Sequence, residues 1–253
     1  MAKVITFTNQ KGGVGKTTTA AAFCGAFVAK GKKVLAIDLD PQGNLAFGLG
    51  ADDDEYTIHD VLIGKVSIHE AIQTTHNCDV IPSNILLSGL ELELSSVGRE
   101  YVLKEKLASI MKFYDYIVID TPPALSILTI NSYIACNDLI IPMTPEILSL
   151  QGIAQLKDTI IAVKKYYNKS LNLRGILLTK YNERILLTKE VEELASIVAG
   201  QLGSSVLKTK ISVSVAVAEA PAHKMSIVRY APRVKASRDY VKVVDELYGE
   251  ELR

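Results

Sequence analysis

The sequence predicts an α/β fold with a doubly wound, mainly parallel sheet, and three observations carry that prediction. Short apolar runs rich in β-branched residues recur, helical patterns alternate with them, and a glycine-rich segment joins the first run to the first helical pattern. Continuously apolar runs are typical of strands buried on both faces. Strands that alternate with helices form parallel, right-handed units around a central sheet. Ligands of such sheets bind at the carboxyl ends of the strands.

The expected elements follow in chain order. Strands are predicted for VITFT at 4–8, VLAID at 34–38, YIVID at 116–120, LIIPM at 139–143 and GILLT at 175–179. Helices are predicted over 17–30, 99–113, 124–135, 149–167 and 187–201. A last helix is expected from Pro232, which suits a first helical position, to about Gly249. Residues 51–98 are less regular, and 206–231 fit either strand or loop.

Length and composition suit one globular domain spanning 1–253. The chain has 253 residues, of which 48% are hydrophobic and 22% charged, so it has ample apolar surface to bury. No repeat, low-complexity tract or Pro/Gly-rich linker divides it. No apolar run reaches the roughly 18 residues of a membrane span. The first apolar run meets Gly and Lys too early for a signal peptide, so we expect a cytoplasmic protein.

Charge and cysteine usage exclude several classes of protein. Lys plus Arg and Asp plus Glu both number 28, so any contact with nucleic acid must come from a local basic patch. Trp is absent and the chain has only 11 Tyr and 5 Phe, so we do not expect an aromatic platform for base stacking. Three cysteines without a C-x-x-C pair exclude a disulfide framework and fit a reducing compartment.

The strongest signal is the segment KGGVGKTT at 11–18, which follows a predicted strand and opens a predicted helix. Glycines let the backbone wrap an anion with its N–H groups inward, and the helix adds its positive end. A lysine and a hydroxyl at the end of the loop suit phosphates and Mg²⁺ respectively. The expected phosphate-loop residues are Lys11, Gly12, Gly13, Val14, Gly15, Lys16, Thr17 and Thr18. A solvated glycine turn is the alternative, and the flanking strand and helix argue against it.

One departure from the strict phosphate-loop pattern is informative. The pattern G-x-x-x-x-G-K-[ST] asks for Gly at position 10, where this chain has Gln10, and a second lysine, Lys11, opens the loop. Two lysine ammonium groups in one pocket repel each other unless additional negative charge lies between them. We therefore expect Lys11 to reach phosphates bound by another subunit, as a charge supplied in trans.

Acidic residues at two strand ends complete the expected site. Asp120 ends the strand YIVID at the sheet edge near the loop, where it is expected to hold Mg²⁺ through a water ligand. Asp38 ends the second strand and is expected to face the metal together with Thr17. Asp40, on the loop beyond, is expected to orient an attacking water. The alternative for Asp120 is a carboxylate that caps the next turn.

Several motifs together resemble the ParA/Soj family of deviant Walker-box ATPases, in the wider group that includes MinD. The resemblance covers nearly the whole chain and rests on NQKGGVGKTT at 9–18, DLDPQGN at 38–44, IDTPPALSILTINS at 119–132, the PEILSLQG region at 145–152 and AEAP at 218–221. It implies a P-loop NTPase fold with a deviant Walker A motif, ATP and Mg²⁺ as cofactors, and an ATP-sandwich homodimer. A ParB-like or other cargo adaptor would stimulate a weak ATPase.

The resemblance also assigns roles to residues. Lys11 resembles the signature lysine that crosses the dimer, Lys16 the phosphate-loop lysine and Thr17 the magnesium ligand. Asp40 resembles the aspartate that promotes hydrolysis, and Asp120 the second acidic motif. Pro122 and Pro123 fall in the switch that responds to the γ-phosphate. Where relatives often carry Pro-Arg-Asn this chain has Ser-Val-Ser at 212–214, so adenine and DNA contacts there are not transferred.

Three functional classes share this architecture: a partition ATPase on DNA, a MinD-like ATPase on a membrane or scaffold, and a nitrogenase-reductase-like electron carrier. A membrane class needs a basic amphipathic C-terminal helix, but this chain ends VKVVDELYGEELR, whose acids oppose anionic lipid. An electron carrier needs cysteines for a shared cluster. Cys24, Cys78 and Cys136 are instead expected to be buried small hydrophobes. Stable membrane anchoring is not expected.

DNA is the partner that the charge pattern favours. Residues 223–242 contain six Lys or Arg against one acid, Asp239. The expected DNA-binding residues are Arg233, Lys235, Arg238 and Lys242, the last three spaced along one helix face. Lysines at 157–169 are expected to extend this patch. A solvated helix face is the alternative. No base-reading motif is present, so binding is expected to be non-specific and the ATP form nucleoid-associated.

Overall fold

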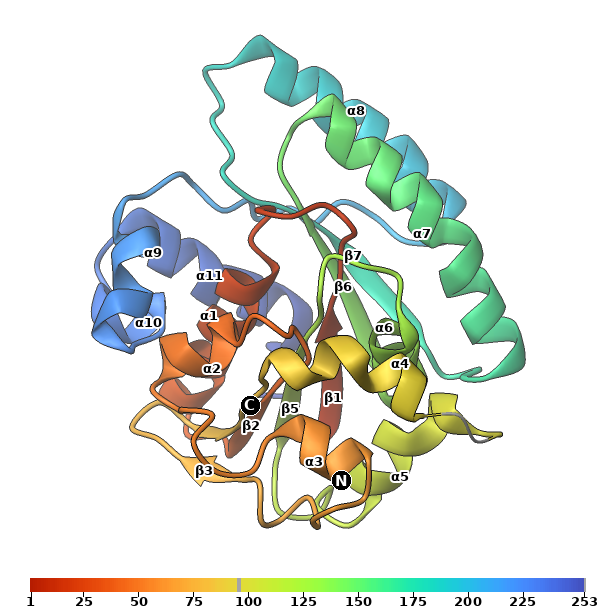
Figure 1. Cartoon of the computed structure of the whole chain (residues 1–253). Coiled ribbons are helices and arrows are strands. Elements are labelled where there is room, and N and C mark those ends of the chain that lie inside the picture. The colour runs from red at the N-terminus through yellow and green to blue at the C-terminus, as the bar shows by residue number, and fades with distance from the viewer. Residues whose placement is uncertain (95–96, 253) are drawn as a thin grey trace.

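The computed structural model describes residues 1–94 and 97–252. Within these residues, seven strands form one sheet in the order β3-β4-β2-β5-β1-β6-β7 (Figure 1). The strands are β1 (Lys3–Phe7), β2 (Val34–Asp38), β3 (Gln73–Thr74), β4 (Asp79–Ile81), β5 (Tyr116–Asp120), β6 (Asp138–Met143) and β7 (Asn172–Leu178). All of these strands pair in parallel except β3, which runs antiparallel to β4. The doubly wound, mainly parallel sheet predicted from the sequence is confirmed.

The register of the central strands aligns their carboxyl ends. Phe7 at the end of β1 is level with Asp120 at the end of β5. Asp38 at the end of β2 is level with Asp120 on the other side of β5. The segments that leave these three strands therefore meet at one edge of the sheet, where ligands of such folds bind.

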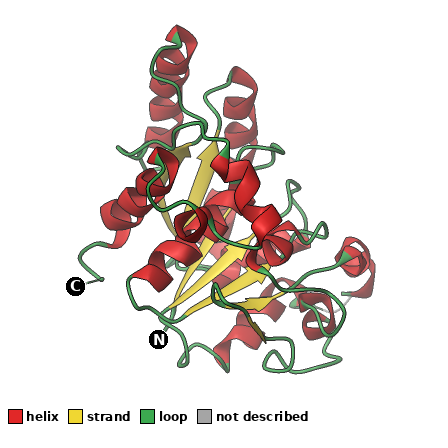
Figure 2. Cartoon of the chain, turned by 90° about the vertical axis from the view of Figure 1, so that its left-hand side faces the viewer, coloured by secondary structure: helices red, strands yellow, loops and turns green. Residues whose placement is uncertain are grey.

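Helices cover both faces of the sheet (Figure 2). One face carries α1 (Lys16–Ala29), α2 (Asn44–Leu49), α9 (Ala216–Glu219), η3 (Ala220–His223), α10 (Ile227–Tyr230) and α11 (Lys235–Tyr248). The other face carries α3 (Ile58–Leu62), η1 (Ile85–Gly89), α4 (Leu90–Glu93), η2 (Arg99–Tyr101), α5 (Val102–Ala108), α6 (Ile127–Ala135), α7 (Ile147–Tyr166) and α8 (Leu186–Gln201). Figure 1 shows α7 and α8 side by side, away from α1 and α11.

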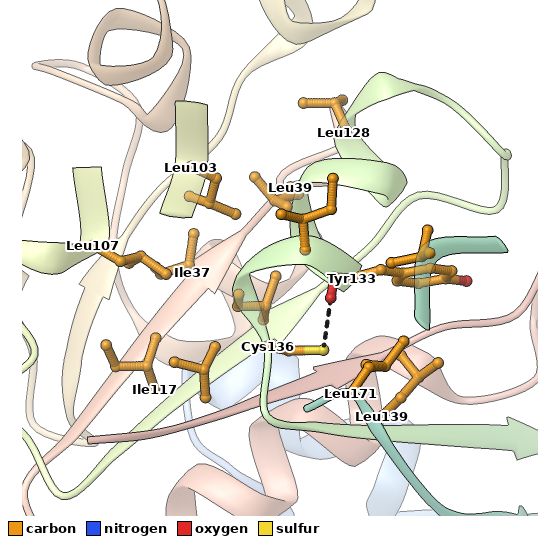
Figure 3. Close-up of a cluster of buried hydrophobic side chains, with 14 of the residues drawn as sticks. Ile37, Leu39, Leu103, Leu107, Ile117, Leu128, Tyr133, Cys136, Leu139 and Leu171 are labelled. Atoms are coloured by element: carbon orange, nitrogen blue, oxygen red, sulfur yellow. Dashed lines mark hydrogen bonds between the residues drawn. The ribbon is translucent and has the colours of Figure 1, made fainter. Parts of the chain in front are cut away.

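Two apolar cores lie on the two sides of the sheet, because successive strand residues point to opposite faces. In β2, Leu35 and Ile37 enter one core and Ala36 enters the other. Figure 3 shows the first core, where Ile37, Ile117 and Leu139 of the sheet meet Leu103, Leu107, Leu128 and Tyr133 of the helices. Cys24, Cys78 and Cys136 are free and buried, as expected from the sequence.

The structure departs from the sequence-based elements in four places. Residues 51–98 contain the short strands β3 and β4 and the helices α3 and α4, too short to show a period. The helix expected over 99–113 ends at Ala108. The ambiguous segment 206–231 makes isolated bridges from Val206 and Ser212 before three short helices. The start of the last helix at Pro232 was wrong: Pro232 lies in a turn, and α11 begins at Lys235.

Candidate nucleotide site

The phosphate loop connects β1 to α1 at the carboxyl edge of the sheet (Figure 1). Gly13 and Gly15 adopt φ angles of +73° and +87°, which L side chains seldom reach. Gly15 is also the N-cap of α1, so the positive end of a 14-residue helix faces the loop. These glycines allow the turn that places backbone N–H groups around an anion.

A cavity of about 760 Å³ opens beside the loop, within the size range of small-molecule sites. Its polar end is lined by Gly12, Gly13, Gly15, Lys16, Thr17, Thr18 and Asp40. Its apolar walls come from Phe47, Ile211, Val213, Val217, Pro221 and Tyr240. Val14 is fully buried, so it offers the site its backbone and not its side chain. A cavity with a phosphate-binding end and apolar walls suits a nucleotide.

Lys16 is the first residue of α1 and is only 6% exposed. Its ammonium donates to the Lys11 carbonyl oxygen over 3.3 Å. Burial lowers the pKa of Lys16, and the nearby carboxyls of Asp120 and Asp40 oppose that shift. A lysine held between two carboxyls and the phosphate loop is placed to neutralise phosphate oxygens.

Thr17 and Asp120 form the part of the site that suits magnesium. The Thr17 hydroxyl donates to Asp120 Oδ2 over 2.6 Å. Asp120 is fully buried, and its Oδ1 has no hydrogen-bond partner among the described residues. Burial raises the pKa of Asp120 well above its ordinary value, and the carboxyl of Asp38 adds to the shift. An unpartnered carboxylate oxygen beside a hydroxyl fits Mg²⁺ or one of its water ligands.

Asp38 has a structural task besides the metal role expected from the sequence. Its Oδ1 accepts from the Asp40 N–H over 3.0 Å, and its Oδ2 accepts from Leu45 and Ala46 over 2.9 and 3.0 Å. Asp38 thereby fastens the loop after β2 to the start of α2. Burial raises the pKa of Asp38 to about 7. Direct ligation would compete with these hydrogen bonds, so the metal role of Asp38 stays a prediction.

Asp40 lies just past β2, lines the cavity and is 9% exposed. Its Oδ1 accepts from the Gln42 N–H over 3.1 Å. Its carbonyl oxygen accepts from the Ser83 hydroxyl over 2.5 Å and from the Gly43 N–H over 3.0 Å. The backbone of Asp40 is therefore fixed at the cavity wall. No pattern in the sequence points to Ser83, because it comes from a segment 43 residues away.

Lys11 lies at the mouth of the loop and is turned toward the connection between β6 and α7. Its ammonium forms an ion pair with the exposed carboxylate of Glu146 and donates to Ser149 Oγ over 3.3 Å. The hydrogen bond from Lys11 is the main reason that the pKa of Glu146 is lowered. Asn9 braces this end of the loop, since its Oδ1 accepts from the Lys11 N–H and its Nδ2 donates to the Pro142 carbonyl.

The Ser-Val-Ser segment forms part of the cavity wall next to α11. Ser212 donates to Asp239 Oδ2 from its N–H over 3.1 Å and from its hydroxyl over 2.7 Å. The Lys235 ammonium reaches the same carboxylate oxygen at 3.4 Å and also contacts the Ser212 hydroxyl. Lys235 therefore stabilises the wall of the nucleotide cavity, a contact that its helical spacing did not reveal.

The four expected DNA-binding residues are all exposed. Lys235 and Lys242 also line a groove of about 730 Å³ beside α11, together with Arg184, Lys208 and Lys210. Lys210 is paired with Glu192. The lysines at 157–169 lie in or just after α7, which packs in the opposite core. They therefore lie across the sheet from α11, so the expected extension of the patch is wrong.

A glycine-rich loop between β1 and α1, an acidic residue at the end of the neighbouring strand, and a parallel sheet define a P-loop nucleotide-binding protein. The family model described as "AAA domain" matches residues 2–173. The chain is 40% identical to the sporulation initiation inhibitor protein Soj of Bacillus subtilis over 252 residues, which is 98% of each chain. It is also 40% identical to the chromosome-partitioning ATPase Soj of Treponema pallidum, over 99% of each. The chain belongs to the ParA/Soj family of partitioning ATPases, as the sequence motifs indicated.

Solved structures agree with the fold. A protein from Mycobacterium smegmatis, named cobyrinic acid a,c-diamide synthase and solved with ADP and magnesium, superposes with a TM-score of 0.86 at 35% identity. The match covers 100% of this chain and 97% of that one. That protein is named for a synthase activity and not for partitioning, so the fold alone does not determine the cellular function. Among the described residues, no helix is long and apolar enough to cross a membrane.

Proposed function

We propose that this protein is a Mg²⁺-dependent ATPase that forms a homodimer with two ATP molecules between its subunits. In the ATP form the dimer binds DNA without sequence preference, and a ParB-like or other adaptor links it to a cargo and stimulates its weak hydrolysis. The domain acts as a single unit over 1–253. The placement of Lys11 is the observation that carries the proposal.

Lys11 is positioned for a task outside its own site. Lys16 already supplies the buried cation of the loop, whereas the Lys11 ammonium lies at the surface against Glu146. A surface cation beside the phosphate loop is available to a nucleotide held by a second copy. Developing charge on a transferred phosphoryl group is stabilised by such a cation supplied in trans.

The residues that line the cavity support the remaining roles in this proposal. The loop N–H groups and Lys16 bind the phosphates, and Thr17 with Asp120 holds Mg²⁺, which offsets phosphate charge when bound. Asp38 positions the loop after β2, and its negative charge lies near enough to Asp120 to favour Mg²⁺ between the loop and the sheet edge. Asp40, fixed by its backbone at the cavity wall, orients the attacking water.

Exposed positive charge on and just before α11 supports DNA as the partner. Arg233, Arg238 and Lys242 are exposed and form no ion pair within the described part of the chain. One monomer offers few such charges, and a dimer presents two copies to one duplex, so binding becomes bivalent. DNA binding in the ATP form would make the protein nucleoid-associated.

A MinD-like ATPase on a membrane or protein scaffold is the alternative, and one observation bears on the membrane form. The apolar face of α11 packs against α1, and Tyr248 near its end is fully buried beside Phe27 and Tyr116. An amphipathic anchor must present its apolar face to lipid. This helix would have to leave the core to do so.

DNA binding and light scattering with ATP, ADP and no nucleotide test the proposal. We expect dimerisation and DNA binding with ATP and neither with ADP. Vesicles containing anionic lipid serve as the competing surface in the same experiment. Binding to vesicles without binding to DNA in any nucleotide state would replace the proposal with the alternative.

A further inference from the structure

We infer that Lys180 and Thr179, at the end of β7, are positioning residues for the phosphate loop: they hold two successive loop carbonyls so that a bound phosphate meets N–H groups. This inference rests on the proposed nucleotide function and adds two residues that the loop motif does not contain. Both side chains line the nucleotide cavity.

The two contacts are direct. The Lys180 ammonium donates to the Gly13 carbonyl oxygen over 2.9 Å. The Thr179 hydroxyl donates to the next carbonyl, that of Val14, over 2.8 Å, and Met143 O lies 3.2 Å from the same hydroxyl. Thr179 also packs against the loop, because a Cβ on Gly15 would lie 3.6 Å from its methyl group.

These contacts extend a pattern that holds most carbonyls of the loop. The Lys11 carbonyl accepts from Lys16, and the Gly15 carbonyl accepts from the N–H and hydroxyl of Thr19. With Gly13 and Val14 held from β7, most loop carbonyls are directed to protein donors. A trans peptide points its C=O and N–H in opposite directions. Fixing the carbonyls thus fixes the N–H groups that an anion needs.

The backbone of Lys180 indicates that its position is imposed by its surroundings. Its φ angle is +49°, a left-handed conformation that is unfavourable for a side chain with Cβ. Hydrogen bonds fix the residues on both sides: Thr179 N–H donates to Met143 O, and Tyr181 N–H donates to Ile211 O, each over 2.8 Å. Strain that persists because flanking contacts over-determine a residue is typical of functional sites.

The positive charge of Lys180 adds a second effect. A cation that hydrogen-bonds to a carbonyl polarises the whole peptide group, so the Val14 N–H on the other side of the Gly13–Val14 peptide becomes a stronger donor. The pKa of Glu146 is lowered mainly by the hydrogen bond from Lys11, and the charge of Lys180 contributes a smaller part in the same direction. We therefore expect Lys180 to strengthen binding of every nucleotide whose phosphates occupy the loop.

Nucleotide titration of Lys180→Met, Lys180→Arg and Lys180→Gly with fluorescent ATP and ADP tests the inference. Lys180→Met should weaken both nucleotides by about tenfold, because it loses a charge-assisted hydrogen bond. The ratio of ATP to ADP affinity should stay unchanged, since the loop holds the phosphates that both share. Lys180→Arg should recover most of the affinity. Thr179→Val should also weaken both nucleotides, and Thr179→Ser, which keeps the hydroxyl, should recover them.

Lys180→Gly separates positioning from general stability. Glycine relieves the left-handed strain, so the melting temperature without nucleotide should rise, while nucleotide affinity falls as in Lys180→Met. Lys224 is the matched control: its φ angle is +54°, it does not line the nucleotide cavity, and within the described residues its side chain forms no hydrogen bond to the loop. Lys224→Gly should raise the melting temperature and leave nucleotide affinity unchanged.

Three results would overturn the inference. Wild-type affinity in Lys180→Met and Thr179→Val would show that neither side chain positions the loop. A loss of affinity that simply follows a loss of melting temperature would show a general structural role. If the wild-type protein itself binds neither ATP nor ADP, the proposed function fails and the inference fails with it, a result that is distinct from normal binding by the variants.

Discussion

At the scale of single residues, the different surroundings of the two loop lysines predict separable tasks. Lys11→Ala should still bind ATP with near wild-type affinity, because its ammonium contacts Glu146 in the monomer and not the cavity. It should lose ATP-driven dimerisation and hydrolysis. Lys16→Ala, as the comparison, should lose about 3 kcal/mol of binding free energy, roughly a hundredfold in affinity. Light scattering with ATP measures the dimer, and a normal dimer in Lys11→Ala would assign Lys11 to the solvated surface.

Asp40 should affect the chemical step more than binding. Asp40→Ala keeps the phosphate loop and the Ser83 contact, since that contact is made by the backbone. We expect it to bind ATP and dimerise but to hydrolyse about 10²–10⁴ times more slowly, the usual range for losing a group that directs proton transfer. Single-turnover measurements separate the chemical rate from binding. Unchanged turnover would move the water-orienting role to another residue.

The buried carboxyls make stability depend on pH in the absence of nucleotide and metal. Burial raises the pKa of Asp38 from 3.8 to about 7, and burial raises the pKa of Asp120 as well. The folded state then binds more protons than the unfolded chain, so stability should fall as pH rises from about 5 to about 7. The pKa of Glu146 is lowered, so the titration of this carboxyl changes stability only at pH values below that window.

Thermal midpoints across this pH window measure the effect. Asp120→Asn should give a flatter profile and a higher midpoint near pH 7 by a few degrees, about 2–4 °C for each kcal/mol in a protein of this size. Asn keeps an oxygen that accepts from the Thr17 hydroxyl, so the fold is retained. A wild-type midpoint that climbs steadily from pH 5 to pH 7 contradicts this view of the site.

At the scale of elements, α1 approaches α10 through a glycine. A Cβ on Gly25 would overlap the Ser226 hydroxyl and lie 2.9 Å from Ser226 Cβ. Ser226 is the N-cap of α10, accepting from the Arg229 N–H. Gly25→Ala should therefore destabilise the protein by about 1–3 kcal/mol, because overpacking forces the two helices apart.

Gly200 in α8 provides the matched control for Gly25. A Cβ there meets no atom within 4 Å, so Gly200→Ala should stabilise the protein by about 0.5–1 kcal/mol through helix propensity alone. Denaturant unfolding of both variants measures the difference. Equal effects would mean that α1 and α10 are not in close contact in solution.

The sequence was informative where a pattern is local. The run YIVID and the adjacent VLAID predicted β5 and β2 to the residue, because fully buried parallel strands are continuously apolar. The loop from Lys11 to Thr18 was equally clear, since its glycines are needed by the backbone itself. The short strands β3 and β4 carry too few residues to show alternation. Glu146, Ser83 and Lys180 join the site only through the fold.

At the scale of the whole molecule, the two faces of the sheet allow a controlled test of DNA binding. Arg233, Arg238 and Lys242 lie in or just before α11, which packs on the α1 side of the sheet, and Lys164, Lys165 and Lys169 lie in or just after α7 on the other side. Changing the first three to Ala should weaken binding on all sequences alike and make the salt dependence shallower by about one unit per lost phosphate contact. ATP binding should survive, because none of the three lines the nucleotide cavity.

The second triple variant carries the same loss of charge on the other face and should bind DNA normally. Lys235 is left intact in both, since it supports the cavity wall through Ser212 and Asp239. Salt titrations with ATP compare the three proteins. If DNA binding weakens in the variant of Lys164, Lys165 and Lys169 and not in the variant of Arg233, Arg238 and Lys242, the DNA surface lies on the α7 side of the sheet.

The ion pair of Lys11 with Glu146 has a consequence for assembly. If the proposed dimer forms, the negative charge of Glu146 that pairs with Lys11 in the single subunit would be replaced by a phosphate of the second subunit's nucleotide. Dimer formation would then exchange one anion for another at the Lys11 ammonium, so the lysine would keep a counterion throughout. Glu146 directly precedes the first turn of α7, so its release from Lys11 would also loosen the start of that helix. Binding of the second nucleotide would then alter the face of the sheet opposite α1, where α7 packs.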